Sequence, residues 1–117
     1  MLMLRLVGGD NNRDLVEMVL SGTKKPYPHL HLEEQRKVFE TAGFQIIRAE
    51  EAFRPIIFYD VAAFVWFAHI IEWEFPDFSV DRCFDKLLEM QETIEQDGKI
   101  QGTIHRYFIV AQKQLSI

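Results

Sequence analysis

The sequence predicts an α/β fold in which a three-stranded sheet carries flanking helices. Three segments have the apolar, β-rich character of strands: residues 2–7, residues 44–59 and residues 100–113. Between them lie segments whose apolar residues recur at the spacing of an α-helix. The expected order is therefore strand, helix, helix, strand, helix, helix, strand.

The composition indicates one domain spanning residues 1–117, with 48% hydrophobic residues and a formal net charge of −5. Because the basic residues are scattered, nucleic acid and anionic membranes are poor partners. The single cysteine, Cys83, excludes an internal disulfide and fits a reducing, cytoplasmic setting, and its place on an apolar helix stripe predicts a buried, inert thiol. The amino-terminal residues do not have the pattern of a signal peptide.

After the first strand comes "GGDNN", with Gly8 and Gly9 followed by three polar residues. A glycine turn at a strand end can bind a ligand, but neither the G-x-G-x-x-G pattern nor the phosphate-loop pattern is present. The favoured interpretation is a turn whose Asp and Asn oxygens cap a helix over residues 12–21. The apolar face of that helix consists of Leu15, Val16, Val19 and Leu20.

The middle of the chain predicts a loop, a second helix and a second strand. Gly43 ends the helix, whose expected inner face is Leu32, Gln35, Val38, Phe39 and Ala42. The strand runs from about Phe44 to Glu50 and continues as an extended arm to Tyr59. Pro55 marks an edge, a bulge or a strand end, because it cannot donate a ladder hydrogen bond.

The second half of the chain predicts two helices and the last strand. Asp60 caps "VAAFVWFAHII", which is apolar all round and is therefore expected to be buried on both sides, while being too short to span a bilayer. Ser79 caps an amphipathic helix that Gly98 ends, with the stripe Val80, Cys83, Phe84, Leu87, Leu88 and Ile94. Residues 107–111 are apolar on both faces, which indicates a central strand. The first two strands should be parallel, whereas the pattern leaves the direction of the last strand open.

Several phrases resemble a known family when taken in order: "VGGDNNRDL", "FETAGFQIIRAEEAFRPIIFYDVAAFVWF", "IIEWEFPDFSVD" and "HRYFIVAQK". From Val7 to Lys113 the chain is similar to the carboxyl half of bacterial class I S-adenosylmethionine-dependent methyltransferases. The resemblance implies a mixed sheet equivalent to the fifth, sixth and seventh strands of that Rossmann-like fold, with the last strand central and antiparallel. Gly8 and Gly9 then match the turn after the fifth strand, on the substrate side.

The resemblance also implies what this sequence lacks. The family holds S-adenosylmethionine with a glycine-rich loop and an acidic residue upstream of the matched region, so this chain alone is expected to bind no cofactor. It would be a methyltransferase fragment, inactive alone, and either a truncated gene product or an isolated domain. Its partner in the intact family is a small-molecule methyl acceptor. The alternative is a non-enzymatic, self-associating or ligand-binding α/β module.

The resemblance assigns substrate contacts to two regions. Asn11 and Asn12 lie in the substrate-side turn, and Tyr59, Trp66 and His69 lie in the segment that covers the substrate mouth. His69 is otherwise a core histidine. Trp73 and Phe75 are expected to be core or interface anchors.

Other candidate groups are given structural interpretations, and no catalytic residue is assigned. His29 and His31 would supply only half of a zinc site, so no metal is predicted. Glu50 and Glu51 are interpreted as a solvated pair pointing to opposite faces. His105 and Arg106 are expected on opposite faces of the last strand, in structural roles.

The first strand is expected to mediate a homodimer. In the resembled fold its outer neighbour is the fourth strand, which this sequence does not encode. Leu2–Val7 would then form an apolar edge with Arg5 as its only charge. Such edges pair with another strand, and two copies pairing antiparallel give the simplest closed assembly.

Overall fold

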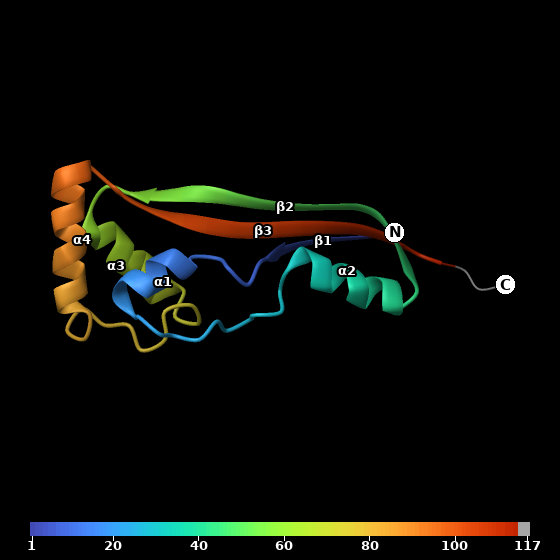
Figure 1. Cartoon of the computed structure of the whole chain (residues 1–117), viewed down its shortest axis with the longest axis horizontal. Helices are drawn as coiled ribbons and strands as arrows, with labels where there is room; N and C mark the ends of the chain where they lie inside the picture. The colour runs from blue at the N-terminus through green and yellow to red at the C-terminus, as the bar shows by residue number, and fades with distance from the viewer. Residues whose placement is uncertain (115–117) are drawn as a thin grey trace. The chain divides into compact units, whose positions relative to one another are not determined.

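The structure, a computed structural model, describes residues 1–114 and has the element order that the sequence predicts (Figure 1). The strands are β1 (Leu2–Val7), β2 (Phe44–Phe58) and β3 (Ile100–Lys113). The helices are α1 (Arg13–Val19), α2 (Leu32–Thr41), α3 (Val61–Ile70) and α4 (Phe84–Asp97). The second strand is longer than expected and continues without a break through Pro55 to Phe58.

The three strands form one sheet in the order β1-β3-β2. β1 runs antiparallel to β3, with Leu2 opposite Ala111 and Val7 opposite Arg106. β3 is therefore central and antiparallel, as the resemblance implies. The expectation of a mixed sheet needs one correction, since β2 also runs antiparallel to β3 and no two neighbouring strands are parallel. Pro55 is tolerated because β2 lies at an edge, where a missing donor breaks no internal ladder.

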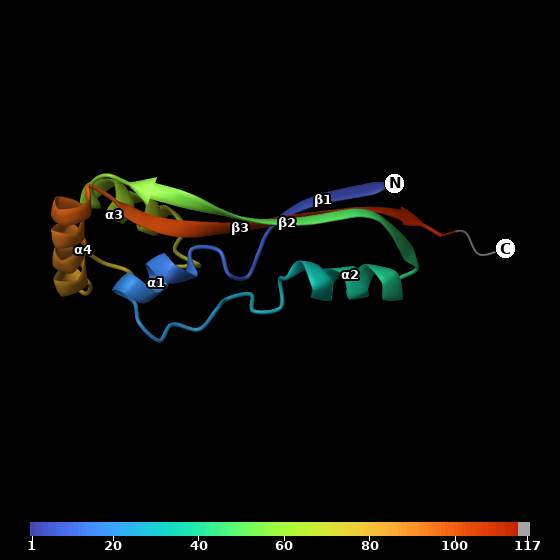
Figure 2. The same cartoon turned by 45° about the horizontal axis from the view of Figure 1, so that its top comes forward.

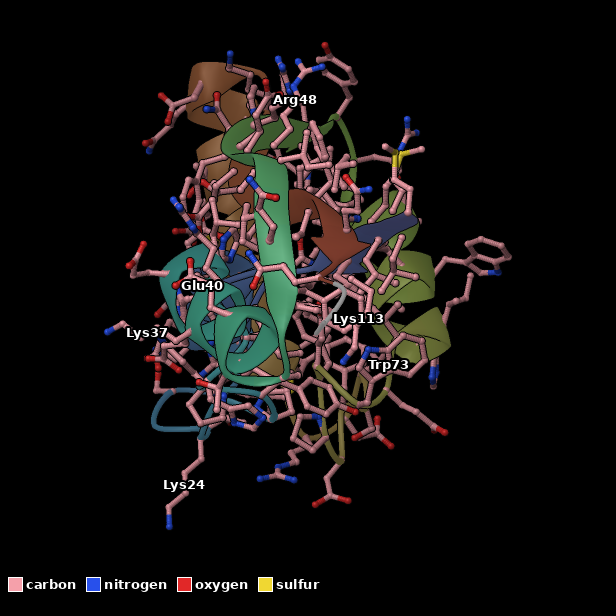
Figure 3. All side chains as sticks on the ribbon, turned by 90° about the vertical axis from the view of Figure 1, so that its right-hand side faces the viewer. Lys24, Lys37, Glu40, Arg48, Trp73 and Lys113 are labelled. Carbon is pink, nitrogen blue, oxygen red and sulfur yellow. The ribbon has the colours of Figure 1, made fainter. Side chains whose placement is uncertain are left out.

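The described residues group into two compact units, and each is treated by itself. Unit 1 contains, among the described residues, residues 1–11, 27–54 and 105–114. Its core lies where α2 packs on one face of the strands (Figure 2), and it centres on Tyr107, Ile109 and Ala111. The end of α2 is tied to β3 by Lys113, whose ammonium donates to the Ala42 carbonyl oxygen at 2.7 Å (Figure 3).

Unit 2 contains residues 12–26 and 55–104 and holds the larger core. Phe64 and Phe75 are fully buried there and meet edge to face at 5.7 Å. The other buried apolar residues come from α1, α3 and α4, from the residues that flank these helices and from the strand ends: Leu15, Val16, Val19, Leu20, Phe58, Ala68, Phe78, Cys83, Leu87, Met90 and Ile100. The predicted inner face of α1 and the buried thiol of Cys83 are thus confirmed.

Local signals in the sequence account for some of the helix ends. The Asp60 carboxylate accepts a hydrogen bond from the Ala63 amide at 2.7 Å, as predicted for an N-cap. Gly43 and Gly98 follow α2 and α4 with φ of 91° and 82°, a left-handed backbone that glycine adopts without strain. Ser79 caps a turn at Arg82, and regular helix starts only at Phe84.

The predicted cap of α1 is wrong. Asn12 has the left-handed φ of 59° and makes no side-chain cap. Its side-chain amide instead donates to Glu74 at 2.7 Å, within unit 2. A tertiary hydrogen bond to a carboxylate has replaced the local one that the sequence offered.

The predicted burial of three helices is wrong in part. α3 buries Phe64 and Ala68 completely but leaves Trp66 71% exposed, so this apolar helix is covered on one side only. Of the predicted α4 stripe, Cys83 just before the helix and Leu87 on it are buried together with Met90. Val80 before the helix and Phe84 and Leu88 on it are exposed. Val38 of α2 is exposed as well. Apolar composition predicted these helices, but it did not predict which of their faces another element would cover.

Among the described residues, no helix combines the length and the apolar character needed to cross a membrane.

The one-sided burial of α3 predicts very different costs for two substitutions on the same helix. Phe64→Asp should lower the free energy of unfolding by at least about 3 kcal/mol, because it removes a buried ring and places an unpaired charge in the core. Trp66→Asp, the matched control on the exposed side, should change it by no more than about 0.5 kcal/mol. Urea unfolding of both variants measures the difference, and similar losses would contradict the one-sided packing.

Candidate functional site

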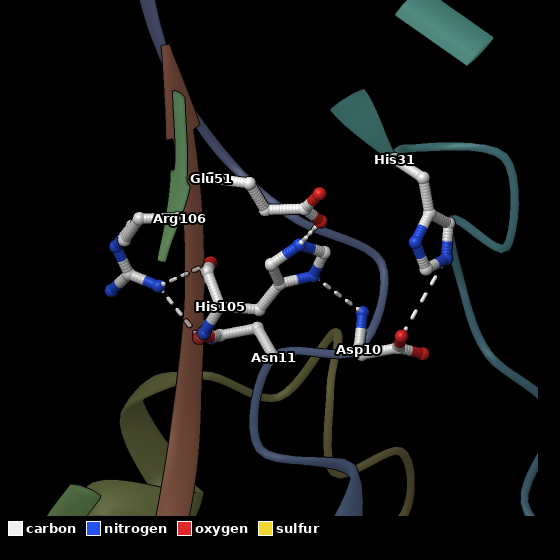
Figure 4. A network of polar contacts seen from close by, with 6 residues as sticks. All are labelled: Asp10, Asn11, His31, Glu51, His105 and Arg106. Atoms are coloured by element: carbon white, nitrogen blue, oxygen red, sulfur yellow. Dashed lines mark hydrogen bonds and ion pairs between the residues drawn. The ribbon is translucent and has the colours of Figure 1, made fainter. Parts of the chain in front are cut away.

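Unit 1 contains a polar network centred on the buried His105 of β3 (Figure 4). The imidazole is fully buried, on the same face of β3 as the apolar side chains of Tyr107 and Ile109. The Phe53 ring stacks on it with centroids 4.2 Å apart and planes 13° from parallel. A polar ring in this position must satisfy its nitrogen atoms inside the protein, because an unpaired buried polar group is costly.

Both ring nitrogens of His105 have partners. The Asp10 backbone amide donates to Nδ1 at 3.2 Å, and Nε2 contacts the Oε1 atom of Glu51 on β2. Because Nδ1 accepts a hydrogen bond, it carries a lone pair, and the ring proton therefore belongs to Nε2 and is donated to Glu51. The network of hydrogen bonds thus selects one tautomer of the neutral imidazole.

The glycine turn is shaped to admit this ring. A Cβ atom on Gly8 would overlap the His105 imidazole, and one on Gly9 would overlap the backbone oxygen of Tyr27. The Gly8 amide donates to the His105 carbonyl oxygen at 2.9 Å, and the Gly9 amide donates to the Leu30 carbonyl oxygen at 2.7 Å. The glycine pair therefore permits close approach to two other segments, which a sequence pattern alone does not reveal.

Asn11 holds the turn against β3. Its Oδ1 accepts the His105 backbone amide at 2.8 Å and the Arg106 Nη1 at 2.6 Å. The same guanidinium nitrogen also donates to the His105 carbonyl oxygen at 3.0 Å. The side chain of Asn11 is thus used to fix the turn, and the residue is only 7% exposed.

His31 completes the group from the loop before α2. Its Nε2 lies 3.7 Å from the Asp10 carboxylate, and its ring centroid lies 5.4 Å from that of His105. One ligand atom from each of Asp10, His31 and His105 lies within 4.8 Å of the others. The structure thus brings together three side chains of types that can bind a metal ion, from the turn, the loop and the last strand.

Glu51 and Tyr107 set the electrostatics beside this group. Burial raises the pKa of the Tyr107 hydroxyl above its ordinary value of 10.0, and the negative charge of Glu51 raises it further. The Tyr107 hydroxyl is buried and has no hydrogen-bond partner among the described residues. Both glutamates are exposed, as the sequence suggested, but Glu51 also contacts the His105 ring, whereas Glu50 pairs with Arg48 at 2.6 Å.

A hollow of about 730 Å³ also lies in unit 1. Three arginine side chains line it, from Arg5, Arg54 and Arg106, together with Glu50 and Glu51. Arg5 and Arg54 make no ion pair within the part of the chain that the structure describes. The lining gives this hollow a local excess of positive charge, in contrast to the acidic chain as a whole.

The structure does not bring the five predicted substrate residues to one site. Asn11 belongs to unit 1 and the other four to unit 2, where Asn12 is 1% exposed and bonded to Glu74. Tyr59 and Trp66 are 70% and 71% exposed, and His69 is also exposed, so it is not a core histidine. Phe75 is a core residue as expected, whereas Trp73 is at the surface (Figure 3).

The sequence alone did not identify His105, Glu51 and Asp10 as one group. Their only local signal is a histidine at an inward position of an apolar strand, and that signal equally fits a structural role. His31 stood out because of its neighbour His29, yet His29 is not part of the group. The other members of the group come from segments distant along the chain, so spacing could not indicate them.

No family model matches this chain, and no curated protein matches it.

The close approach of Gly8 to His105 predicts a coupled effect on stability. Gly8→Ala should lower the free energy of unfolding by about 1–3 kcal/mol, because the new methyl group displaces a packed ring. In a His105→Ala background, where that ring is absent, the same substitution should cost clearly less. Urea unfolding of the four proteins gives the coupling energy. Equal costs in both backgrounds would show that strain elsewhere in the turn causes the loss.

Proposed function

We propose that this chain is the carboxyl half of a class I S-adenosylmethionine-dependent methyltransferase domain and supplies the substrate side of its site. The sheet order carries the proposal: β3 lies between β1 and β2 and runs opposite to β1. This is the arrangement that the resemblance implies for the fifth, seventh and sixth strands. The connections agree with it, because two helices separate β1 from β2 along the chain.

In this proposal the cofactor is held by a glycine-rich loop and an acidic residue that are not in this sequence. The present chain binds a small-molecule methyl acceptor and presents it to S-adenosylmethionine. Because methyl transfer needs an in-line approach of acceptor and donor, positioning supplies much of the rate. We place the protein in the cytoplasm, with neither nucleic acid nor membrane as a partner, on the basis of its charge and single cysteine.

The exposed face of α3 is the part of unit 2 that fits acceptor binding. Trp66 and His69 lie three residues apart on this helix and are both exposed, as is Tyr59 just before it. Aromatic rings and an imidazole suit an apolar acceptor that carries a polar group. Asn11 and Asn12 fit a supporting role better, because their side chains already hold the turn to His105 and Glu74.

The proposal predicts that the purified chain does not bind S-adenosylmethionine measurably. We expect titration calorimetry to give no dissociation constant tighter than about 100 μM, which corresponds to about 5.5 kcal/mol. A second test is to read the coding sequence upstream of Met1 for the missing cofactor-binding half. An in-frame or frameshifted stretch with a glycine-rich loop, whose product restores binding when joined to this chain, supports the proposal. Tight binding by the chain alone would refute it.

The alternative, a self-associating α/β module, is favoured by the position of β1 at an edge of the sheet. The Gly8 amide points toward β3, since it donates to the His105 carbonyl oxygen. In an antiparallel ladder, residues that bond to the same neighbour alternate. The amides of Leu6 and Leu4 therefore also face β3, whereas those of Arg5 and Met3 face the open edge. A second copy of this chain would pair with that open edge.

The alternation predicts which proline substitution separates two copies. Light scattering at micromolar concentration should show a dimer for the native chain and a monomer for Arg5→Pro, which removes an outward donor and leaves the β1–β3 ladder intact. Arg5→Ala is the matched control, because it removes the charge and keeps the amide, and it should remain dimeric. A monomeric native chain, or equal effects of the two variants, would exclude pairing through this edge.

A further inference from the structure

We propose that Asp10, His31 and His105 form a binding site for a divalent first-row transition metal ion, with Glu51 as the carboxylate that orients His105. This site lies wholly within unit 1 and goes beyond the methyltransferase proposal. Two imidazoles and one carboxylate form a ligand set that is typical of catalytic zinc and non-haem iron sites. Three protein ligands leave a position open for water or a substrate atom.

The ligand atoms can reach such an ion if the side chains close around it and the Asp10 amide moves away from Nδ1 of His105. The three atoms lie within 4.8 Å of one another, and the His31 Nε2 is already 3.7 Å from Asp10 Oδ2. Ligand atoms at the usual zinc distances are separated by about 3.3 Å in a tetrahedral site. The side chains of Asp10 and His31 are 32% and 29% exposed, so they can move inward and an ion can enter from solvent.

The buried His105 ring is preset as a ligand by its hydrogen bonds. Glu51 accepts the Nε2 proton, and Nδ1 accepts the Asp10 backbone amide at 3.2 Å, so an ion bound to Nδ1 replaces that hydrogen bond with a metal–nitrogen bond. Metal-binding histidines generally donate their other ring nitrogen to a carboxylate or carbonyl group, which fixes the tautomer and makes the imidazole more basic. The contact between Glu51 and His105 has this form. Stacking on Phe53 holds the plane of the ring.

The donor set also selects the class of ion. Imidazole suits Zn²⁺, Fe²⁺, Co²⁺ and related ions, whereas Mg²⁺ prefers oxygen ligands in near-octahedral geometry. With two nitrogen donors and one carboxylate, the site should bind Zn²⁺ and should not bind Mg²⁺ at comparable concentrations.

Zinc titration of the full chain, freed of metal by a chelator, tests the site at pH 7. We expect one Zn²⁺ per chain with a dissociation constant tighter than about 10 μM, and no heat from Mg²⁺ under the same conditions. His31→Gln and Asp10→Asn should each weaken binding at least about tenfold, and Glu51→Gln should weaken it about 10- to 100-fold. His29→Gln is the matched control, because His29 lies in the same loop outside the ligand group, and it should stay within about twofold.

A spectroscopic measurement keeps the test independent of whether variants fold. Histidine nitrogen NMR of the native chain should show Zn²⁺ on Nδ1 of His105, with the proton kept on Nε2. Absence of one-to-one binding would overturn the proposal, as would native affinity in both His31→Gln and Asp10→Asn. Equal loss in His29→Gln and His31→Gln would overturn it too, since the loop histidines alone would then bind the ion. Circular dichroism of each variant separates lost ligands from lost fold.

Discussion

The buried imidazole of His105 is the constraint on which the architecture of unit 1 depends. A fully buried ring with two polar nitrogens needs an acceptor on one side and a donor on the other, and Glu51 and the Asp10 amide supply them. These partners belong to β2 and to the turn after β1, so one side chain on the central strand joins both neighbouring segments. Gly8 makes this possible, because any side chain there would occupy the space of the ring.

Tertiary hydrogen bonds also explain why Asn11 and Asn12, which follow the glycine pair, do not cap α1. Asn11 is drawn toward β3 by the His105 amide and the Arg106 guanidinium, and Asn12 by Glu74 in unit 2. A hydrogen bond to a charged group stabilises more than a neutral local cap. The turn is therefore positioned by tertiary contacts on both of its sides, and helix α1 begins without a side-chain cap.

The arrangement of the sheet concerns the methyltransferase proposal, whereas the polar cluster on β3 concerns the metal-site proposal. The central, antiparallel β3 matches the family arrangement that the sequence resembles, and it leaves β1 at an open edge. The polar cluster on β3 has a different origin, because it arises from side chains that the resemblance did not single out. The proposed metal binding and the proposed methyl-acceptor binding can therefore be tested separately, with different probes.

By itself the sequence determined the number, type and order of the elements, because hydrophobic periodicity and capping act over a few residues. The Asp60 cap and the glycine ends of α2 and α4 are of this local kind. Periodicity also gave the inner face of α1 and the central place of β3. It could not show that Trp66 stays exposed, since an apolar side chain is buried only where another element covers it.

Only the tertiary structure decided the candidate site. Asp10, His31 and His105 stand in three segments that are far apart along the chain, and no local pattern records that they meet. Their meeting depends on the pairing of β1 with β3, which places Val7 opposite Arg106 and brings the following turn beside His105. Which strands pair depends on the summed burial and hydrogen bonding of residues that are far apart along the chain. The site could therefore be recognised only once the sheet was known.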